Sequence, residues 1–284
     1  MIAITGASGQ LGRLVLTHLL AKVPAASVVA VVRHPAKAAD LAQQGIVLRQ
    51  ADYNHPAALA AAFAGVETVL LISSNEVGQR AAQHRNVIGA AQRAGVKLLV
   101  YTSLLRADSS PLNLAPEHLA TETALKASGL SSIILRNGWY TENYTASVPP
   151  AVANGAFLGS AADGRIASAA RADYAAAAVA ALTGAARVGQ TYELAGDAAY
   201  TLADLAAEIS RQTGKNIPYK DLPEADYRAV LLKIGLQAGL AAGLASWDVA
   251  ASHGALFDDG RQLSKLIGRP TTPLAESVRQ VLKK

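Results

Sequence analysis

The stretch Met1-Ile2-Ala3-Ile4-Thr5-Gly6-Ala7-Ser8-Gly9-Gln10-Leu11-Gly12 decides the fold. Its apolar start predicts a buried strand, and residues 14–20 have the apolar spacing of a helix. Between them, Gly6 permits a sharp turn, Gly9 lets the backbone approach a ligand, and Gly12 lets the helix pack closely on the sheet. The free N–H groups and positive dipole end of such a helix suit a pyrophosphate. The stretch therefore favours a dinucleotide site over a structural turn without a ligand.

The sequence around this turn supports that interpretation, although the spacing G-x-x-G-x-x-G differs from the more familiar G-x-G-x-x-G. A second apolar run, residues 28–32, follows at the distance that a strand–helix–strand unit requires. Further strands are expected at residues 46–50, 67–72, 96–102 and 131–135, with helices at residues 56–64, 79–94 and 115–128 between them. This alternation predicts an α/β fold with a doubly wound parallel sheet of the Rossmann type.

The alternation becomes less regular after residue 136. We expect residues 1–136 to form a dinucleotide-binding domain, and residues 137–284 a smaller, mostly helical substrate lobe with segments that return to the Rossmann sheet. The features expected in this lobe are a loop at residues 137–140, a break at Val148-Pro149-Pro150, a helix from Ala172, a strand at residues 191–194 and a capped helix that begins at residues 201–204.

The composition narrows the class of protein. The chain has 284 residues, 51% of them hydrophobic, a net charge of +5 and no cysteine, which excludes disulfides and thiolate catalysis. No basic cluster with interleaved aromatic residues indicates nucleic-acid binding, and the six histidines lack metal-ligand spacing. We expect a soluble cytoplasmic protein without a signal peptide, because the first strand begins at residue 2, and without a membrane span, because the apolar stretch at residues 235–247 is short and glycine-rich.

Arg33 bears on the choice of dinucleotide, because it ends the second expected strand, where the adenosine ribose lies in such folds. An acidic residue there favours NAD, whereas an arginine accommodates the 2′-phosphate of NADP. Val32-Arg33-His34-Pro35 contains no carboxylate, so the pattern favours NADP over NAD. The alternative is that Arg33 is a solvated surface residue.

Polar residues also follow other expected strands. Asp52, after the third strand, could meet the adenine amino group or be a turn or helix-capping aspartate. Ser73 to Asn75 follow the fourth strand, where small polar side chains suit a ribose and a pyrophosphate. Thr102 and Ser103 end the fifth strand, near the expected nicotinamide position.

The sequence resembles the NmrA-like group of atypical short-chain dehydrogenases, and within it the bacterial NAD(P)H:quinone oxidoreductases. The residues that carry this resemblance are Gly6 to Gly12, Val31 to Lys37, Gln50 to Tyr53, Leu71 to Arg80, Asn137 to Asn143, Leu194 to Asp197, Phe257 to Asp259 and Leu263 to Gly268. The resemblance implies NADPH-dependent reduction of a small-molecule quinone. It also implies that NADPH is bound by Gly6, Ala7, Ser8, Gly9, Gln10, Leu11, Arg33, Ser73, Ser74, Asn75, Asn137, Gly138, Trp139, Tyr140, Thr141, Glu142 and Arg171.

Some of these residues have plainer explanations. Arg171 could stand with Asp173 at the start of a helix without touching a cofactor. Tyr140 and Tyr144 are expected to contact the quinone, in an apolar wall with Trp139 and Phe157. Aromatic residues in such a segment could equally be part of the core.

The Tyr-x-x-x-Lys pair of the broader dehydrogenases is replaced by His118-x-x-x-Glu122, so ordinary ketone reduction is not expected. A quinone differs, because its two-electron reduction product is a delocalised anion much less basic than an alkoxide. Hydride transfer then needs little help from an acid. We assign no catalytic side chain: His118 could donate a proton, but we favour a hydrogen bond on the helix surface.

The sequence thus favours an enzyme that transfers hydride directly from NADPH to a quinone, since no separate flavin-binding signature is visible. The alternative is a non-catalytic NADP(H)-binding redox sensor that acts through a protein partner. A third interpretation is reduction of an activated double bond in an aromatic metabolite. The sequence does not indicate an oligomeric state.

Overall fold

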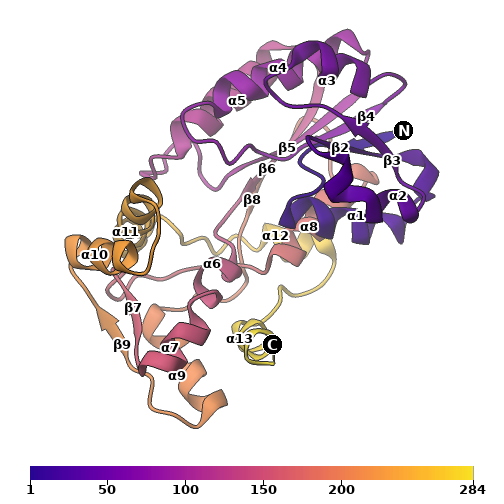
Figure 1. The fold of residues 1–284 in the computed structure, drawn as a ribbon. Coiled ribbons are helices and arrows are strands. Elements are labelled where there is room, and N and C mark those ends of the chain that lie inside the picture. Colours follow the sequence, from indigo (N-terminus) through magenta and orange to yellow (C-terminus); the bar gives the residue numbers. More distant parts are fainter. Residues whose placement is uncertain (284) are drawn as a thin grey trace.

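A seven-stranded parallel sheet forms the centre of the computed structural model, which describes residues 1–283 (Figure 1). The strand order is β3-β2-β1-β4-β5-β6-β8, and every neighbouring pair is parallel. The strands are β1 (Ile2–Ile4), β2 (Val28–Val32), β3 (Val47–Gln50), β4 (Thr68–Leu71), β5 (Leu98–Leu104), β6 (Ser131–Asn137) and β8 (Thr191–Leu194). The order reverses between β1 and β4, which is the arrangement of a doubly wound Rossmann sheet. The predicted fold class is confirmed.

Helices cover both faces of this sheet. One layer contains α1 (Gln10–Leu20), α8 (Arg171–Leu182) and α12 (Gln262–Ile267), and the other contains α3 (Pro56–Ala62), α4 (Arg80–Arg93) and α5 (Ala115–Ala127). Short segments η1 (Ala25–Ser27), η2 (Pro35–Ala38) and α2 (Ala39–Gln43) flank β2 and β3. All five residues of β2 are buried, since both faces of the strand are covered. Each large apolar side chain buried here, such as Leu16, contributes about 1.5–3 kcal/mol.

The second half of the chain lies beside the sheet (Figure 1). It packs around a second apolar cluster, which also includes Leu104, Ala107, Leu112 and Ala115. Its elements are α6 (Thr141–Thr145), α7 (Val148–Asn154), β7 (Phe157–Gly159), α9 (Leu202–Thr213), β9 (Tyr219–Asp221), α10 (Glu224–Lys233), α11 (Ala238–Ser252) and α13 (Leu274–Leu282). The parallel pair β7 and β9 was not expected from the sequence. The capping box predicted for α9 is present, between Thr201 and Asp204.

The expected break at Val148-Pro149-Pro150 is wrong, because these residues form the first turn of α7. Proline is accepted there, since the N–H groups of a first turn have no partner within the helix. Segments of the second half also lie against the sheet: β8 pairs with β6, and α8 packs beside α1. The domain boundary at residue 136 stays a prediction.

Two further findings concern residues 1–283. None of their helices combines the length and the apolar character needed to cross a membrane. Nor do these residues bring three histidine or acidic side chains together as a metal site would require. The cytoplasmic location stays a prediction.

Candidate functional site

The glycine turn after β1 has the geometry that its sequence predicts. Gly6 has a positive φ of 59°, in the left-handed region that glycine adopts readily. A Cβ at Gly12 would lie 2.4 Å from the carbonyl oxygen of Gly6, so a larger residue would push α1 away from the strand. Gly9 caps α1 without a side chain, and the first turn of α1 contains no acidic residue. The N–H groups at this end are therefore available to an anion.

A cavity of about 330 Å³ lies beside this turn, at the carboxyl ends of β1, β2, β3 and β4. It is lined by Gly6, Ser8, Gly9, Gln10, Leu11, Gly12, Val31, Val32, Arg33, Ala51, Asp52, Tyr53, Ile72, Ser73, Ser74, Asn75, Glu76 and Gln83. We call this cavity the groove. It stands where the strand order reverses, the usual place for a ligand in such sheets. Ala7, also expected to bind the cofactor, is buried in the core beneath the turn.

Arg33 lies at the surface, where 54% of its side chain is exposed, but it also has a charged partner. Its Nη1 donates to Oε1 of Glu76 at 2.9 Å, and both side chains line the groove. Asp52 accepts a hydrogen bond from the backbone N–H of Asn54 at 2.8 Å, as a turn aspartate does, and it also lines the groove. Both interpretations of Asp52 are therefore compatible with its position.

A second group of candidate residues joins the groove through Arg171. Nη1 of Arg171 donates to Oε1 of Gln10 at 2.5 Å, and its guanidinium lies 4.5 Å from the ring centre of Tyr140. The backbone N–H of Arg171 donates to both carboxylate oxygens of Glu142, at 2.9 and 3.0 Å. Glu142 thus caps α8, where a negative charge is favourable. The structure thereby brings the segment after β6 next to the glycine turn.

That segment begins with two closely confined residues. Asn137 is buried, and its side-chain oxygen has no hydrogen-bond partner within residues 1–283. A Cβ at Gly138 would lie 2.9 Å from the carbonyl oxygen of Leu194 and 3.0 Å from the hydroxyl of Tyr174. Farther along, Oγ1 of Thr141 lies 2.8 Å from Oγ of Ser168. A ligand that donates a hydrogen bond could satisfy the Asn137 oxygen.

The four aromatic residues proposed as a wall lie in different environments. Tyr140 alone is partly exposed, and it packs edge-on against Tyr174. Trp139 is buried against Trp247, and Phe157 is buried in the second apolar cluster. The hydroxyl of Tyr144 donates to Asp248 at 3.0 Å inside the same cluster. These three positions favour the plainer interpretation, that the rings are part of the core.

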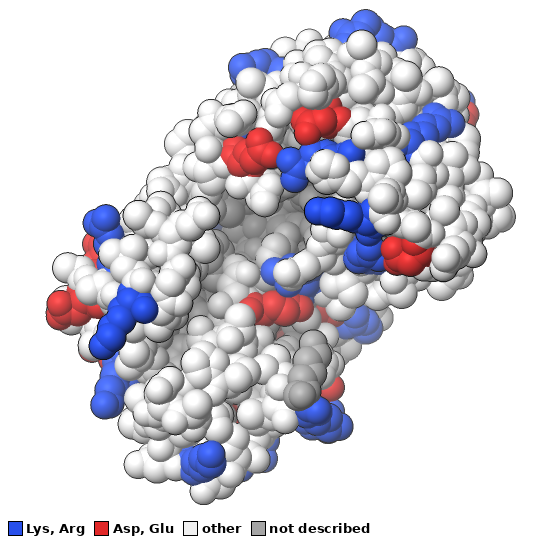
Figure 2. Space-filling view, viewed as in Figure 1, with Lys and Arg blue, Asp and Glu red and all other residues white. Residues whose placement is uncertain are grey.

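The surface beyond this segment is concave. On the face shown in Figure 2, a deep hollow separates the half that contains α4 and α5 from the half that contains α10 and α11. Mostly uncharged residues line this hollow (Figure 2). Such a surface can accept a flat, mainly apolar molecule.

Comparison with known proteins agrees with this geometry. Residues 6–185 match the NAD(P)H-binding family. The chain belongs to this family. It is 61% identical to Quinone oxidoreductase 2 of Escherichia coli K12 over 278 residues, which cover 98% of this chain and 97% of that protein. The crystal structure of an E. coli NADPH-dependent quinone oxidoreductase complexed with NADPH has a TM-score of 0.97 and 60% identity, and the match covers 99% of this chain and 100% of that one.

The resemblance to the NmrA-like group is also confirmed. An Aspergillus flavus oxidoreductase with an NmrA-like family domain is 37% identical over 148 residues, which cover 50% of this chain and 48% of that protein. His118 and Glu122 occupy the positions where the resemblance places the Tyr-x-x-x-Lys pair of the broader dehydrogenases.

The expectation that His118 forms a hydrogen bond is confirmed, but its expected position on the helix surface is wrong. His118 is 5% exposed, and its Nδ1 lies 2.7 Å from the hydroxyl of Tyr101 inside the protein. Burial, reinforced by the nearby charge of Arg80, lowers the pKa of His118 to about 3. The imidazole is therefore neutral near pH 7, so the acidic imidazolium form is not populated.

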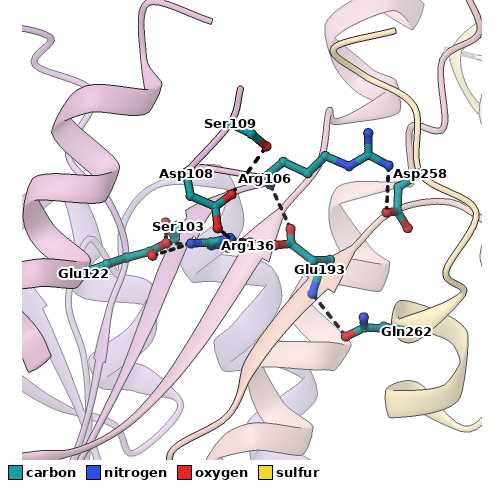
Figure 3. Close-up of polar contacts among 9 residues, drawn as sticks. All are labelled: Ser103, Arg106, Asp108, Ser109, Glu122, Arg136, Glu193, Asp258 and Gln262. Atoms are coloured by element: carbon teal, nitrogen blue, oxygen red, sulfur yellow. Dashed lines mark hydrogen bonds and ion pairs between the residues drawn. The ribbon is translucent and has the colours of Figure 1, made fainter. Parts of the chain in front are cut away.

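Glu122 is buried and belongs to a network of polar contacts (Figure 3). Its carboxylate accepts two hydrogen bonds from Arg136, and Oε1 also accepts one from Ser103 at 2.5 Å. Arg136 further donates to Asp108 at 3.0 Å and to Glu193 at 2.8 Å. These hydrogen bonds, the one to Glu122 first, raise the pKa of Arg136. The network fixes the end of β6, directly before Asn137.

Sequence reasoning missed two residues of α4 that hold the loop after β4. The backbone N–H of Ser74 donates to Nε2 of His84 at 2.9 Å, and Nε of Arg80 donates to the carbonyl oxygen of Ser74 at 2.7 Å. Because Nε2 accepts, the proton of His84 is on Nδ1, which lies 2.9 Å from Thr121. Arg80 and His84 are four residues apart, and that spacing places them on one helix face. This four-residue spacing is the only sign in the sequence that the two side chains act on the same loop.

Proposed function

We propose that the protein reduces a quinone with NADPH, by direct hydride transfer and without a flavin. The observation that carries the proposal is the arrangement at the groove: an uncapped helix end beside Gly9, and Arg33 at the end of β2. This arrangement occurs in a chain that is 61% identical to Quinone oxidoreductase 2 of E. coli along nearly its full length.

The residues present fit NADPH at both ends. The uncapped N–H groups of α1 suit the pyrophosphate, and the guanidinium of Arg33 suits the 2′-phosphate. The buried side-chain oxygen of Asn137 lacks a protein partner among residues 1–283 and can accept a hydrogen bond from a carboxamide. Bound NADPH supplies the hydride. We assign its binding to the seventeen residues that the family resemblance indicates, with Arg171 and Glu142 linking the segment after β6 to the glycine turn.

The chain's own residues orient and shield the reactants in this proposal. His118 is neutral and hydrogen-bonded to Tyr101, and Glu122 is hydrogen-bonded to Arg136. We therefore assign neither side chain as a proton donor. A quinone tolerates this, because its reduced anion is stabilised by delocalisation. Tyr140 is the proposed quinone contact, since its ring is partly exposed and stands beside Arg171. The buried position of Tyr144 favours a role in the core.

The test is consumption of NADPH, followed by its absorbance, with and without a simple benzoquinone and with free flavin rigorously removed. The proposal predicts that oxidation of NADPH depends on both the protein and the quinone. Tight NADPH binding without turnover would contradict it.

That second outcome would instead support a non-catalytic NADP(H)-binding redox sensor acting through a protein partner. One observation favours this alternative: the positions of the usual catalytic pair, His118 and Glu122, are both engaged in buried contacts. A sensor would retain the groove and Arg33 but would need no acceptor site. Turnover with a benzoquinone therefore discriminates between the two functions.

A further inference from the structure

Arg33 and Glu76 approach each other across the adenosine end of the groove. Arg33 directly follows β2 and Glu76 lies in the loop after β4, and the 2.9 Å contact between them joins the two segments that a bound adenosine must reach. Arg33 also lines a neighbouring cavity of about 460 Å³, together with His34, Gln50 and Asp52. Rotation of the Arg33 side chain alone can therefore move its guanidinium away from Glu76.

Glu76 is held in place by more than Arg33. Its second carboxylate oxygen, Oε2, accepts a hydrogen bond from Nε2 of Gln83 at 2.7 Å, and Gln83 is 1% exposed. The backbone N–H of Glu76 donates to Oγ of Ser74 at 3.1 Å. A carboxylate anchored in this way stays at the groove when Arg33 moves.

We propose that Glu76 determines how strongly the protein discriminates NADPH from NADH, by competing with the 2′-phosphate for the guanidinium of Arg33. The inference rests on the proposed function, because it takes Arg33 to be the phosphate-binding residue. Glu76 then acts as a specificity-determining residue that limits the preference for NADPH.

The sign of the effect follows from the charges. A 2′-phosphate that binds Arg33 either displaces the Glu76 carboxylate or shares the guanidinium with it. Both possibilities weaken binding, because two anions within the Debye length, about 8 Å at physiological ionic strength, repel each other. NADH has only a hydroxyl at that position, so it can bind while Arg33 and Glu76 keep their hydrogen bond. Removing the charge of Glu76 should therefore favour NADPH selectively.

The experiment measures dissociation constants of NADPH and NADH for the full chain by titration calorimetry at fixed ionic strength. Glu76→Gln keeps the size of the side chain and an oxygen that can accept from Gln83. We expect it to tighten NADPH binding up to about fivefold, the range for a partly exposed ion pair. The affinity for NADH should change less than twofold. With Arg33→Gln in the background, the gain from Glu76→Gln should become smaller, since no guanidinium is left to compete for.

Glu67→Gln is the matched control. Glu67 precedes β4 at the opposite end of that strand, where it pairs with Lys97 at 2.5 Å, so the variant removes the same charge away from the groove. It should leave the ratio of the two dissociation constants unchanged.

Three results would overturn the inference. An unchanged ratio in Glu76→Gln would show that Glu76 does not compete for Arg33. An equal gain with and without Arg33 would indicate general repulsion alone, and weaker binding of both dinucleotides would indicate a direct contact with the cofactor. If wild-type protein prefers NADPH in these cases, the proposed function survives. A wild-type protein that binds no NADPH overturns both.

Discussion

The guanidinium of Arg136 and the carboxylate of Glu122 form two parallel hydrogen bonds, 3.0 Å from Nε to Oε1 and 2.8 Å from Nη2 to Oε2. Both residues are 8% exposed. Glu122 stands where the broader dehydrogenases carry the lysine of their catalytic pair. In this chain the position braces α5 against β6, and Glu193 extends the brace to β8 (Figure 3). If the resemblance places this position correctly, Glu122 has a structural contact where those enzymes have a catalytic lysine.

This pair predicts an asymmetric response to mutation. Arg136→Met leaves the carboxylates of Glu122 and Glu193 without their cation, so the free energy of unfolding should fall by about 3–5 kcal/mol. The double variant Arg136→Met with Glu122→Met should be less destabilised than Arg136→Met alone, because it removes the stranded buried charge. Urea unfolding measures both values.

The exposed pair Arg211–Glu208 provides the control, since Arg211→Met should leave the free energy of unfolding nearly unchanged. If the double variant is no more stable than Arg136→Met, the brace depends on packing of the guanidinium rather than on charge pairing.

The arrangement of the sheet could be predicted because its signals are local. The glycine turn, the buried run of β2 and the capping box at Thr201 each involve residues close together in sequence. The start of α7 was mistaken for a break, because proline both stops helices and begins them. The pair β7 and β9 joins segments about sixty residues apart, and no short pattern marks such pairing.

The site was only partly predictable for the same reason. Arg33 could be identified from its place after β2, but its partner Glu76 is 43 residues away. The burial of His118 has a signal in the sequence: residues 118, 121, 122 and 125, all buried, have the i, i+3, i+4 and i+7 spacing of a core-facing stripe. Polar residues in such a stripe indicate internal hydrogen bonds rather than a surface.

His118 predicts a pH dependence of stability. Its folded pKa, lowered to about 3, lies below the ordinary value of about 6.5, so the unfolded chain binds the proton more readily. Its contribution is fully present above pH 6.5 and is lost as the pH falls toward 3, at up to about 1.4 kcal/mol per pH unit. His118→Gln should therefore unfold with a shallower loss of stability on acidification.

Two other groups must be allowed for in that comparison. His84, with its pKa also lowered to about 3 by burial, acts in the same direction, whereas Asp248, with its pKa raised to about 6 by burial, acts in the opposite direction between pH 6 and about 4. Both remain in His118→Gln, so the difference from wild type isolates His118. Identical slopes between pH 6.5 and 4 would show that His118 is protonated in the folded protein. Turnover with a benzoquinone should stay within about threefold, because His118 is not the proton donor.

Gly12 predicts coupled losses of stability and cofactor binding. A Cβ there would lie 2.4 Å from the Gly6 carbonyl oxygen and 2.8 Å from Cα of Ala7, so Gly12→Ala must shift α1. We expect a loss of about 1–3 kcal/mol in the free energy of unfolding, together with weaker NADPH binding. Gly239→Ala in α11 is the control, since a Cβ there meets no atom within 4 Å beyond its chain neighbours and the backbone of its own helix. It should stabilise the protein by about 0.5–1 kcal/mol. Unchanged NADPH affinity in Gly12→Ala would contradict the assignment of the turn.

Substitutions at Tyr140 and Tyr144 should have different effects: the first should change the KM for a benzoquinone, and the second should change stability. Tyr140 is partly exposed beside Arg171, so Tyr140→Ala should raise the KM for a benzoquinone about three- to tenfold, the loss expected for an aromatic contact. Tyr144→Phe removes only the hydroxyl that donates to Asp248, which should cost about 1 kcal/mol of stability and leave the KM within twofold. Steady-state kinetics and urea unfolding of both variants separate the two roles. A KM that rises as strongly in Tyr144→Phe would place Tyr144 at the substrate, because loss of a core hydrogen bond alone does not change substrate affinity selectively.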